Sequence, residues 1–426
     1  MKLLWIFLAF SLTAAERLTS VETKIVQAVD SSSAESNALL EKIVNLNSGT
    51  FNPAGVRAVG EVLRPEFEKL GFAVRWLPMD EVHRAGHLIA ERKGTHGKRV
   101  LMVGHMDTVF ELTSPFRKWT LLSPTSASGP GTSDMKGGLM VMLFALKAMH
   151  QAGTLDGTNI TVYLTGDEEN AGEPLSISRG DFIEKGKASE AAVEFEGGSR
   201  SDGRDFATIA RRSASLWNLK TTGREGHSAG IFSERAGSGA IYEISRILAA
   251  FESQLKEPDL TYNTGVLVGG SNVKFDPAKN AGTAIGKPNI IASTAYASGD
   301  IRTVTEEQLK RVREKMKQIV AQHLPQTGAE ITFEDKYPSM AATEGNKQLL
   351  KVLNTVNLDL NLEAMEPLPP SRRGAGDISF VAPYVDSISG FGSLGGGAHA
   401  PGETIDLSRQ PVQTKRAALF LYRLTR

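Results

Sequence analysis

The sequence predicts an α/β protein in which a domain with a mixed sheet flanked by helices is interrupted by a smaller α+β unit. Apolar runs typical of buried strands alternate with helical patterns up to about residue 209, which indicates a sheet covered by helices. From about residue 210 the strand patterns accompany two amphipathic helices, as expected for helices on one face of an antiparallel sheet. The α/β pattern of the first 209 residues returns after Pro338. We therefore expect one domain built from segments 16–209 and 337–426 around an insert, 210–336.

The first segment carries the elements of a layered α/β domain. A continuous apolar run over 99–103 is typical of a strand in a sheet that is covered on both faces. An almost wholly apolar stretch over 137–150 predicts a buried helix. The helices predicted in this segment are 31–46, 56–70 and 137–150, and the strands are 72–77, 87–91, 99–103, 159–165 and 191–195.

The insert and the last segment follow the same rules of periodicity. The insert is expected to contain strands over 215–221, 261–268, 290–302 and 329–334 and helices over 236–251 and 306–323. The stretch 275–287 is polar and contains Gly, Pro and Asn, which predicts a loop. The last segment predicts helices over 346–355 and 412–424.

The composition narrows the classes of function. The chain has 426 residues, with 48 Lys and Arg against 48 Asp and Glu, so it lacks the basic excess of most nucleic-acid-binding proteins. It contains no Cys, which excludes a disulfide, a thiolate nucleophile and a Cys-ligated zinc or iron–sulfur site. A metal would therefore have to be bound by carboxylates and by some of the eight His of the chain.

The N-terminus has the pattern of an export signal. Lys2 precedes an apolar run over 3–12 and small residues at 13–15, as in secretory signal peptides. The run is too short to span a bilayer, and no other stretch predicts stable membrane insertion. We expect residues 1–15 to be a signal peptide and the protein to be exported to a bacterial periplasm or secreted. A buried N-terminal helix is the alternative.

Polar residues follow three of the predicted core strands. His105 and Asp107 share one face of an extended chain, so that the carboxylate can orient the imidazole. A His satisfied inside the core is the alternative. The run 165–169 ends in three adjacent carboxylates, which repel one another unless a cation lies among them, and a solvated acidic loop is the alternative. Glu194 and Glu196 end a further strand.

Three Gly-rich segments contribute more polar residues. The first, 131–138, holds Asp134 ahead of a buried helix and lacks the Gly-Lys-Ser/Thr order of a phosphate-binding loop, which argues against a nucleotide site. His399 lies in 395–403, and His227 lies in 223–230 of the insert. Strand ends and loops together supply nitrogen and oxygen donors that suit zinc in a hydrolytic site, with enough ligands for two ions.

The order of these motifs resembles that of a known enzyme family. GHMDTV, GTSDMKGG, TGDEE, FEGG, GREGHSAG and GGGAHA are similar, in this order, to motifs of the co-catalytic zinc exopeptidases. That family contains glutamate carboxypeptidases, aminoacylases, desuccinylases and di- and tripeptidases. The resemblance extends from about residue 30 to the end of the chain, and it implies a zinc-exopeptidase catalytic domain interrupted by a lid that also serves for dimerisation.

The resemblance also implies two zinc ions per chain and a role for each motif. The implied ligands are His105 and Glu196 for one ion, Glu169 and His399 for the other, and Asp134 as a bridge that is followed by a cis peptide bond. Asp107 would orient His105. Glu168 would act as general base and later acid, with a metal-bridging hydroxide as the nucleophile. His227 would help to stabilise the oxyanion, in dimeric relatives from the partner subunit.

The residues that would hold the substrate are less sharply implied. Relatives that release C-terminal glutamate often use an Arg near the end of the lid, where this chain has Lys336 instead. Arg302 and Arg373 are further cationic candidates, and Asn289 resembles a lid Asn of the family.

The expected function is that of a metallo-hydrolase. We expect an exopeptidase that cleaves the C-terminal amide bond of a small peptide or N-acyl amino acid, as a homodimer formed through the lid and without a nucleic-acid partner. An aminoacylase or dipeptidase on the same scaffold is the alternative. A metal-free binding homologue is a further alternative, but such a protein would be expected to have lost some of the ligands.

Overall fold

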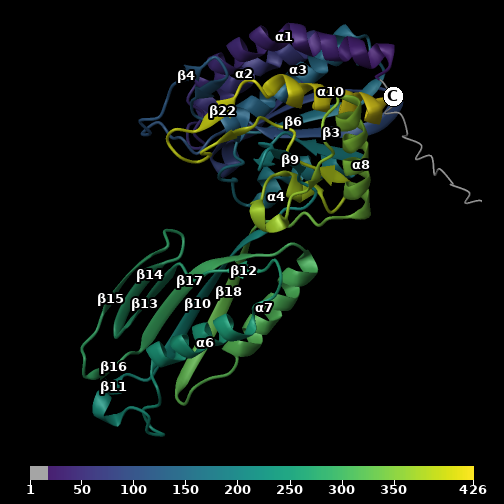
Figure 1. Ribbon diagram of the computed structural model, residues 1–426. Coiled ribbons are helices and arrows are strands. Elements are labelled where there is room, and N and C mark those ends of the chain that lie inside the picture. Colours follow the sequence, from purple (N-terminus) through teal and green to yellow (C-terminus); the bar gives the residue numbers. More distant parts are fainter. Residues whose placement is uncertain (1–17) are drawn as a thin grey trace, which may run out of the picture.

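The computed structural model describes residues 18–426, so the predicted signal peptide at 1–15 lies outside the described residues. Figure 1 shows two bodies, a larger one in which helices cover a sheet and a smaller one built from the middle of the chain. The early part of the chain, in purple, and the late part, in yellow, both belong to the larger body. The predicted fold class, an α/β domain interrupted by an α+β unit, is thereby confirmed.

The larger body is built on a six-stranded mixed sheet. Its strands, in spatial order, are β1 (Ala73–Met79), β2 (Arg84–Arg92), β6 (Thr158–Thr165), β3 (His96–His105), β7 (Ala191–Glu194) and β20 (Ser387–Ile388). The first three pair antiparallel, and β6, β3, β7 and β20 pair parallel. Because β3, β6 and β7 run in the same direction, their carboxyl ends meet at one edge, where open α/β sheets place their ligands.

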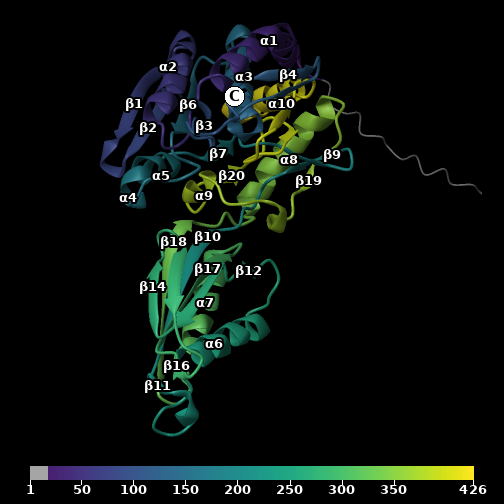
Figure 2. The ribbon, with the colours of Figure 1, turned by 90° about the vertical axis from the view of Figure 1, so that its left-hand side faces the viewer.

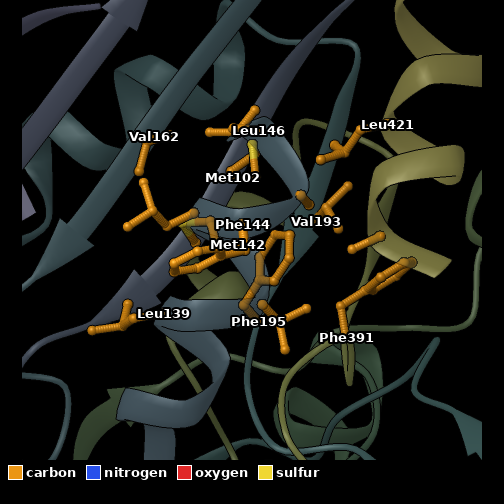
Figure 3. Packing of buried hydrophobic residues seen from close by; sticks show 14 of the residues in the cluster. Met102, Leu139, Met142, Phe144, Leu146, Val162, Val193, Phe195, Phe391 and Leu421 are labelled. Atoms are coloured by element: carbon orange, nitrogen blue, oxygen red, sulfur yellow. The ribbon is translucent and has the colours of Figure 1, made fainter. Parts of the chain in front are cut away.

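Both faces of the sheet are covered by helices. Val100 and Met102 of β3 belong to the main core, whereas Leu101 and Val103 pack into a second cluster on the opposite face. The main core lies against α1 (Ser20–Val44), α3 (Gly137–Gln151) and α10 (Gln410–Thr425), and the second cluster lies against α5 (Gly180–Lys187) and α9 (Ile378–Val381). Figure 3 shows Phe144 of α3 packed among side chains of the main core. This burial explains why α3 is apolar on nearly every side.

Helix α1 begins at Ser20 rather than at the predicted position 31. Thr19 caps it, because the Thr19 hydroxyl accepts the backbone N–H of Glu22 at 3.2 Å and the Glu22 carboxylate accepts the N–H of Thr19 at 2.8 Å. Ile25 and Val29 are buried in the main core. Capping and tertiary burial therefore extend the helix through a stretch rich in Ser and Thr, where periodicity alone is weak.

The remaining elements of the larger body lie around this framework. They are α2 (Pro53–Lys69), α4 (Leu175–Ser178), α8 (Glu344–Asp359), β4 (Thr120–Ser123), β5 (Ser126–Ser128), β8 (Ser199–Ser201), β9 (Arg204–Ala207), β19 (Glu366–Pro367), β21 (Gly395–Gly396) and β22 (Thr404–Asp406). Both helices predicted for the last segment are confirmed, as α8 and α10. Among the residues that the structure describes, no helix combines the length and the apolarity that crossing a membrane requires.

The smaller body is a two-layer unit. Its sheet contains β12 (Thr261–Tyr262), β13 (Val266–Gly270), β17 (Thr294–Arg302), β10 (Ala214–Gly223) and β18 (Thr327–Tyr337), all antiparallel to their neighbours. Its helices, α6 (Ala240–Gln254) and α7 (Glu306–Val320), lie on one face, as Figure 2 shows. Trp217, Phe251 and Met316 are fully or almost fully buried in the core between the layers. The chain enters this unit through β10 and leaves it through β18.

Two strand predictions in the insert need refinement. The strand predicted over 261–268 is divided into β12 and β13, with an irregular step at Asn263–Gly265 where both segments still bond to β17. The strand predicted over 290–302 is divided into β16 (Ile290–Ile291) and β17, because β16 leaves the sheet to pair with β11 (Gly226–His227).

The loop predicted over 275–287 is wrong. Most of this stretch belongs to a hairpin of β14 (Asn272–Asp276) and β15 (Ala281–Ile285). The Pro and Asn residues make its turn, in which Asn280 has a positive φ of 48°. The ring of Phe275 stacks on Tyr296 of β17 with 5.5 Å between the centroids, so a tertiary contact favours strand pairing in a stretch of polar composition.

Candidate functional site

The predicted metal ligands gather at the edge where β3, β6 and β7 end. His105 is the last residue of β3, Glu168 and Glu169 follow the end of β6, and Glu196 lies just after β7. Asp134 comes from the turn Thr132–Lys136 that leads into α3. Since these strands are neighbours in the sheet, residues that are up to about ninety positions apart in sequence meet in one place.

Two histidines face the two oxygens of one aspartate. The Nε2 atom of His105 lies 3.1 Å from Oδ1 of Asp134 and 3.1 Å from Oε1 of Glu196. The Nε2 atom of His399 lies 3.0 Å from Oδ2 of Asp134 and 3.1 Å from Oε2 of Glu169. Asp134 therefore belongs to two three-residue groups whose donor atoms lie within 4.8 Å of one another. The peptide bond that follows Asp134 is cis, as the family resemblance implies.

The donor set suits a pair of divalent metal ions. Imidazole nitrogen and carboxylate oxygen are ordinary zinc ligands, and a carboxylate that presents one oxygen to each side can bridge two ions. The Oε1 atom of Glu169 is buried and has no hydrogen-bond partner among residues 18–426. A buried carboxylate oxygen without a partner is costly unless a cation neutralises it. The residues present therefore fit the implied metal centre.

Asp107 holds His105 and the neighbouring loop together. Its Oδ1 atom lies 3.3 Å from Nδ1 of His105 and accepts the backbone N–H of Glu168 at 3.0 Å. Its Oδ2 atom accepts the hydroxyl of Thr50 at 2.6 Å and the N–H of Glu169 at 3.1 Å. Burial would raise the pKa of Asp107, but the hydrogen bond from His105 and the other donors hold it below its usual value. Asp107 thus stays ionised and fixes the orientation of the imidazole.

The electrostatics of the centre show an excess of buried carboxylate. Burial, together with the charges of Glu196 and Glu169, raises the pKa of Glu168 well above its usual value, although His105 opposes this. Burial raises the pKa of Glu169 to about 7. Hydrogen bonds to Asp134 and Glu169 raise the pKa of His399 to about 11. The raised pKa values mean that these groups hold protons at a place where bound metal ions would otherwise balance the negative charge of the carboxylates.

Each acidic motif contributes only part of its carboxylates to the centre. In the run 165–169, Asp167 turns away and pairs with Arg179 at 2.7 Å, where both side chains are fully buried. Glu194 likewise pairs with Arg211 and accepts the hydroxyl of Ser389. Asp167 therefore does not contribute to the proposed metal centre, because a buried guanidinium already neutralises it.

Four of the predicted site residues lie elsewhere. His227 in β11 and Asn289 beside β16 lie together at the far end of the insert, where β11 and β16 are labelled in Figure 1. Arg302 pairs with Asp300 within β17 at 2.9 Å. Lys336 pairs with Glu173 of the loop that follows β6 and with Glu334, so it lies beside that loop but is already neutralised. The structure does not bring the other three residues to the strand ends.

Arg373, in contrast, lies beside the proposed ligands. It lines a cavity of about 200 Å³ together with Asp134, Glu196 and the glycine segment 395–397. Its Nη2 atom donates to the carbonyl of Gly197 at 2.8 Å and lies 3.5 Å from Oε2 of Glu196. Its Nε atom is buried and has no partner in the part of the chain that is described. Burial lowers the pKa of this guanidinium, as does the nearby Arg211.

The sequence analysis assigned no role to three residues that support the site. Thr50 donates to Asp107, as described above. Tyr337, the last residue of β18, donates its hydroxyl to the carbonyl of Glu168. Glu403 lies in the Gly-rich motif of His399, and its carboxylate bonds to the turn that carries Asp134. Only Glu403 had a local signal, since it is a lone acidic residue in a motif otherwise made of small residues and His.

Comparison with known proteins identifies the family. The model of peptidase family M20/M25/M40 matches residues 101–423. Carboxypeptidase G2 from Pseudomonas sp. strain RS-16 is 27% identical over 396 residues, which cover 90% of this chain and 87% of that protein. A succinyl-diaminopimelate desuccinylase from Gluconobacter oxydans is 23% identical over 398 residues, which cover 90% of this chain and 96% of that protein.

Solved structures share the whole fold. An aminopeptidase from Bacillus cereus has a TM-score of 0.71 at 16% identity, covering 92% of this chain and 99% of its own. A dinuclear metal-binding peptidase of the M20 family from Bacillus subtilis has a TM-score of 0.64 at 14% identity, covering 93% of this chain and 99% of its own. The family match extends over most of the chain and includes the convergent histidines and carboxylates, so the protein belongs to peptidase family M20/M25/M40 and is a metallo-hydrolase.

Proposed function

We propose that the protein is a zinc-dependent exopeptidase that hydrolyses the C-terminal amide bond of a small peptide or N-acyl amino acid. The observation that carries this proposal is the placement of Asp134, whose two oxygens face His105 on one side and His399 on the other. Glu196 completes the first ligand set and Glu169 completes the second. Two zinc ions held in this way would lower the pKa of a water between them and polarise the scissile carbonyl.

Glu168 is the proton carrier of the proposed reaction. Its Oε2 atom lies 4.0 Å from Nε2 of His105, next to the place where the ligand sets meet. Asp107 accepts the backbone N–H of Glu168, and Tyr337 donates to its carbonyl, so the backbone is fixed on both sides. In our proposal the carboxylate takes a proton from the attacking water and passes it to the leaving nitrogen, a role that a raised pKa favours.

The proposed substrate anchor is Arg373 rather than Lys336 or Arg302. Lys336 and Arg302 pair with carboxylates that are not proposed metal ligands, whereas the carboxylate beside Arg373 is the proposed ligand Glu196. Arg373 lines the cavity beside Asp134 and Glu196 and has a buried donor atom that no described residue uses. A guanidinium at this position matches the planar geometry of a substrate carboxylate.

His227 and Asn289 would act from a second copy of the chain or after movement of the insert. Both lie at the far end of the insert, and Nδ1 of His227 accepts the N–H of Ala229 at 3.1 Å, which leaves Nε2 free to donate outward. We propose that His227 stabilises the oxyanion in a homodimer formed through the insert. Export, as indicated by the N-terminal pattern, is part of the same proposal.

Metal analysis and a substrate panel test this function. We expect about two zinc ions per chain in the purified protein. The panel contains N-acyl amino acids and dipeptides that differ in the C-terminal residue, each with a free and an amidated carboxyl group. Rapid hydrolysis of N-acyl amino acids with little action on dipeptides would favour an aminoacylase, and the reverse would favour a dipeptidase. A protein with no metal and no hydrolysis would contradict the proposal and support a binding homologue.

Replacement of the proposed anchor separates substrate binding from chemistry. We expect Arg373→Met to raise KM about 10–100-fold for substrates with a free carboxyl group, because a hydrogen-bonded charge pair contributes about 1.5–3 kcal/mol. Arg372→Met is the matched control, since Arg372 stacks over the ring of Phe206 at 5.8 Å and does not line the cavity. An equal loss for free and amidated substrates would show that Arg373 does not hold the carboxylate.

A further inference from the structure

Glu403 connects two loops that carry proposed metal ligands. It lies four positions after His399, directly before β22, and only 1% of its surface is exposed. Its Oε1 atom accepts the backbone N–H of Ser133 at 2.6 Å and that of Asp134 at 2.9 Å. Its Oε2 atom accepts the N–H of Gly131 at 3.1 Å. One buried carboxylate thus takes three backbone donors from a single turn, and that turn presents Asp134 to both histidines.

The connection includes the backbone and neighbouring hydroxyls. Oε1 of Glu403 also accepts the hydroxyl of Ser133 at 3.0 Å, and the carbonyl of Glu403 accepts the hydroxyl of Ser128 at 2.8 Å. On the other side, the N–H of Glu403 donates to the carbonyl of Ala400 at 3.1 Å, which closes the loop that follows His399. His399 itself has a positive φ of 64°, a conformation that a non-glycine residue keeps only where its surroundings fix it.

The hydrogen bonds of the Glu403 carboxylate do more than compensate for the burial of its charge. No Lys or Arg among the described residues makes an ion pair with Glu403, so N–H and O–H donors hold the carboxylate, and the charge of the buried Lys136 acts on it from beyond ion-pair distance. Its negative charge lies close to that of Asp134, which opposes it. A neutral apolar residue would avoid this cost, but it could not accept the three N–H groups that set the direction of the Asp134 side chain.

We propose that Glu403 is a positioning residue for the metal pair. By fixing the turn at Asp134 and the loop at His399 relative to each other, it keeps the two ligand sets at a fixed separation. The Asp134 carboxylate could then bind both ions. The inference rests on the proposed metal centre. Groups that orient metal ligands contribute to affinity, and their loss commonly weakens metal binding about 10–100-fold.

The test measures metal binding instead of turnover alone. The protein comprising residues 16–426, without the proposed signal peptide, is prepared free of metal and titrated with cobalt(II), which reports ligand geometry through its visible absorption. We expect the wild type to bind two ions and Glu403→Ala to bind the second ion at least about tenfold more weakly, with an altered spectrum. Glu403→Gln should restore most of the affinity, because its Oε1 atom can still accept from Ser133 and Asp134.

A matched control separates positioning from general stability. Glu22 is also buried, accepts the N–H and hydroxyl of Thr19 and pairs with Arg423, far from the strand ends. Glu22→Gln should lower the melting temperature of the metal-free protein while both cobalt affinities stay within about twofold of wild type. If Glu403→Ala lowers stability in the same way as Glu22→Gln and leaves the cobalt affinities and the spectrum unchanged, the proposal is overturned. If the wild type itself fails to bind two ions, the proposed metal centre fails instead.

Discussion

The two bodies of the molecule differ in what they bury. In the larger body, some charged side chains are completely buried. Arg179 is fully buried between Asp167 and Asp377, and Arg211 pairs with Glu194 where both side chains are almost fully buried. In the insert, the core is almost wholly apolar and most ion pairs lie at the surface. Among residues 18–426, the network of buried ion pairs lies in the body that carries the strand ends, and Glu243 is the exception in the insert.

This difference explains how a cluster of acidic residues can be both stable and available for metal. At the end of β6, Asp167 is neutralised by Arg179, and at the end of β7, Glu194 is neutralised by Arg211. The next carboxylates along each strand end face the centre instead. The buried guanidinium groups therefore remove part of the repulsion and fix the backbone from which the remaining ligands project.

The largest effect should come from Glu168, whose carboxylate lies 4.0 Å from His105 and pairs with no Lys or Arg among residues 18–426. We expect Glu168→Gln to lower kcat about 10²–10⁴-fold, because the variant cannot carry a proton, while zinc content stays at the wild-type value. Steady-state kinetics and metal analysis of the same preparation measure both. Glu173→Gln in the same loop, where the side chain pairs with Lys336, is the control and should retain activity. Loss of zinc in Glu168→Gln would mean that Glu168 is a ligand.

The next effect compares a fully buried arginine with a partly exposed one. Arg179→Met leaves Asp167 and Asp377 without their cation, so it should lower the free energy of unfolding by about 3–5 kcal/mol. Arg302→Met removes a pair at the surface of the insert and should cost about 0–1 kcal/mol. Urea denaturation of both variants measures the difference. Similar costs would show that the two bodies do not differ in their dependence on buried charge.

How far the sequence predicts this structure depends on the range of the contacts. The continuous apolar run in β3 and the spacing of His105 and Asp107 are local patterns, and the predicted strand and shared face follow from them. Asp167 and Arg179 are only twelve positions apart in sequence. No periodicity, however, indicates which of the three adjacent carboxylates turns away from the site to pair with this arginine.

Local sequence patterns do not predict contacts between residues that are far apart in the sequence. Glu403 bonds to a turn about 270 positions earlier in the chain. The family resemblance implies that His399 and Asp134 lie at one metal centre, but no local pattern predicts this contact of Glu403. The hairpin β14–β15 was missed because its polar turn dominates the composition, while the stacking of Phe275 on Tyr296 depends on the folded sheet. The ligand motifs could be recognised in order, but the residues that hold them in place required coordinates.

The smallest effect concerns Glu243, the exception in the insert because its carboxylate is fully buried. Arg246 donates to it at 2.7 Å, and the N–H of Leu324 and the hydroxyl of Thr327 donate at 2.9 and 3.1 Å. Burial would raise the pKa of Glu243, but the hydrogen bond and charge of Arg246 and the other donors hold it below the ordinary value of 4.5. The unfolded chain therefore binds the proton more tightly than the folded chain does.

The sign of the pH dependence follows from this order of pKa values. The stabilisation is fully present above pH 4.5 and is lost as the pH falls through the lower pKa of the folded state. Glu243→Gln should destabilise the protein by about 1–2 kcal/mol at pH 7, and the gap to wild type should narrow in urea titrations below pH 4.5. A gap that is constant with pH would show that Glu243 stabilises the insert by shape alone, and the contrast between the two bodies would then hold without exception.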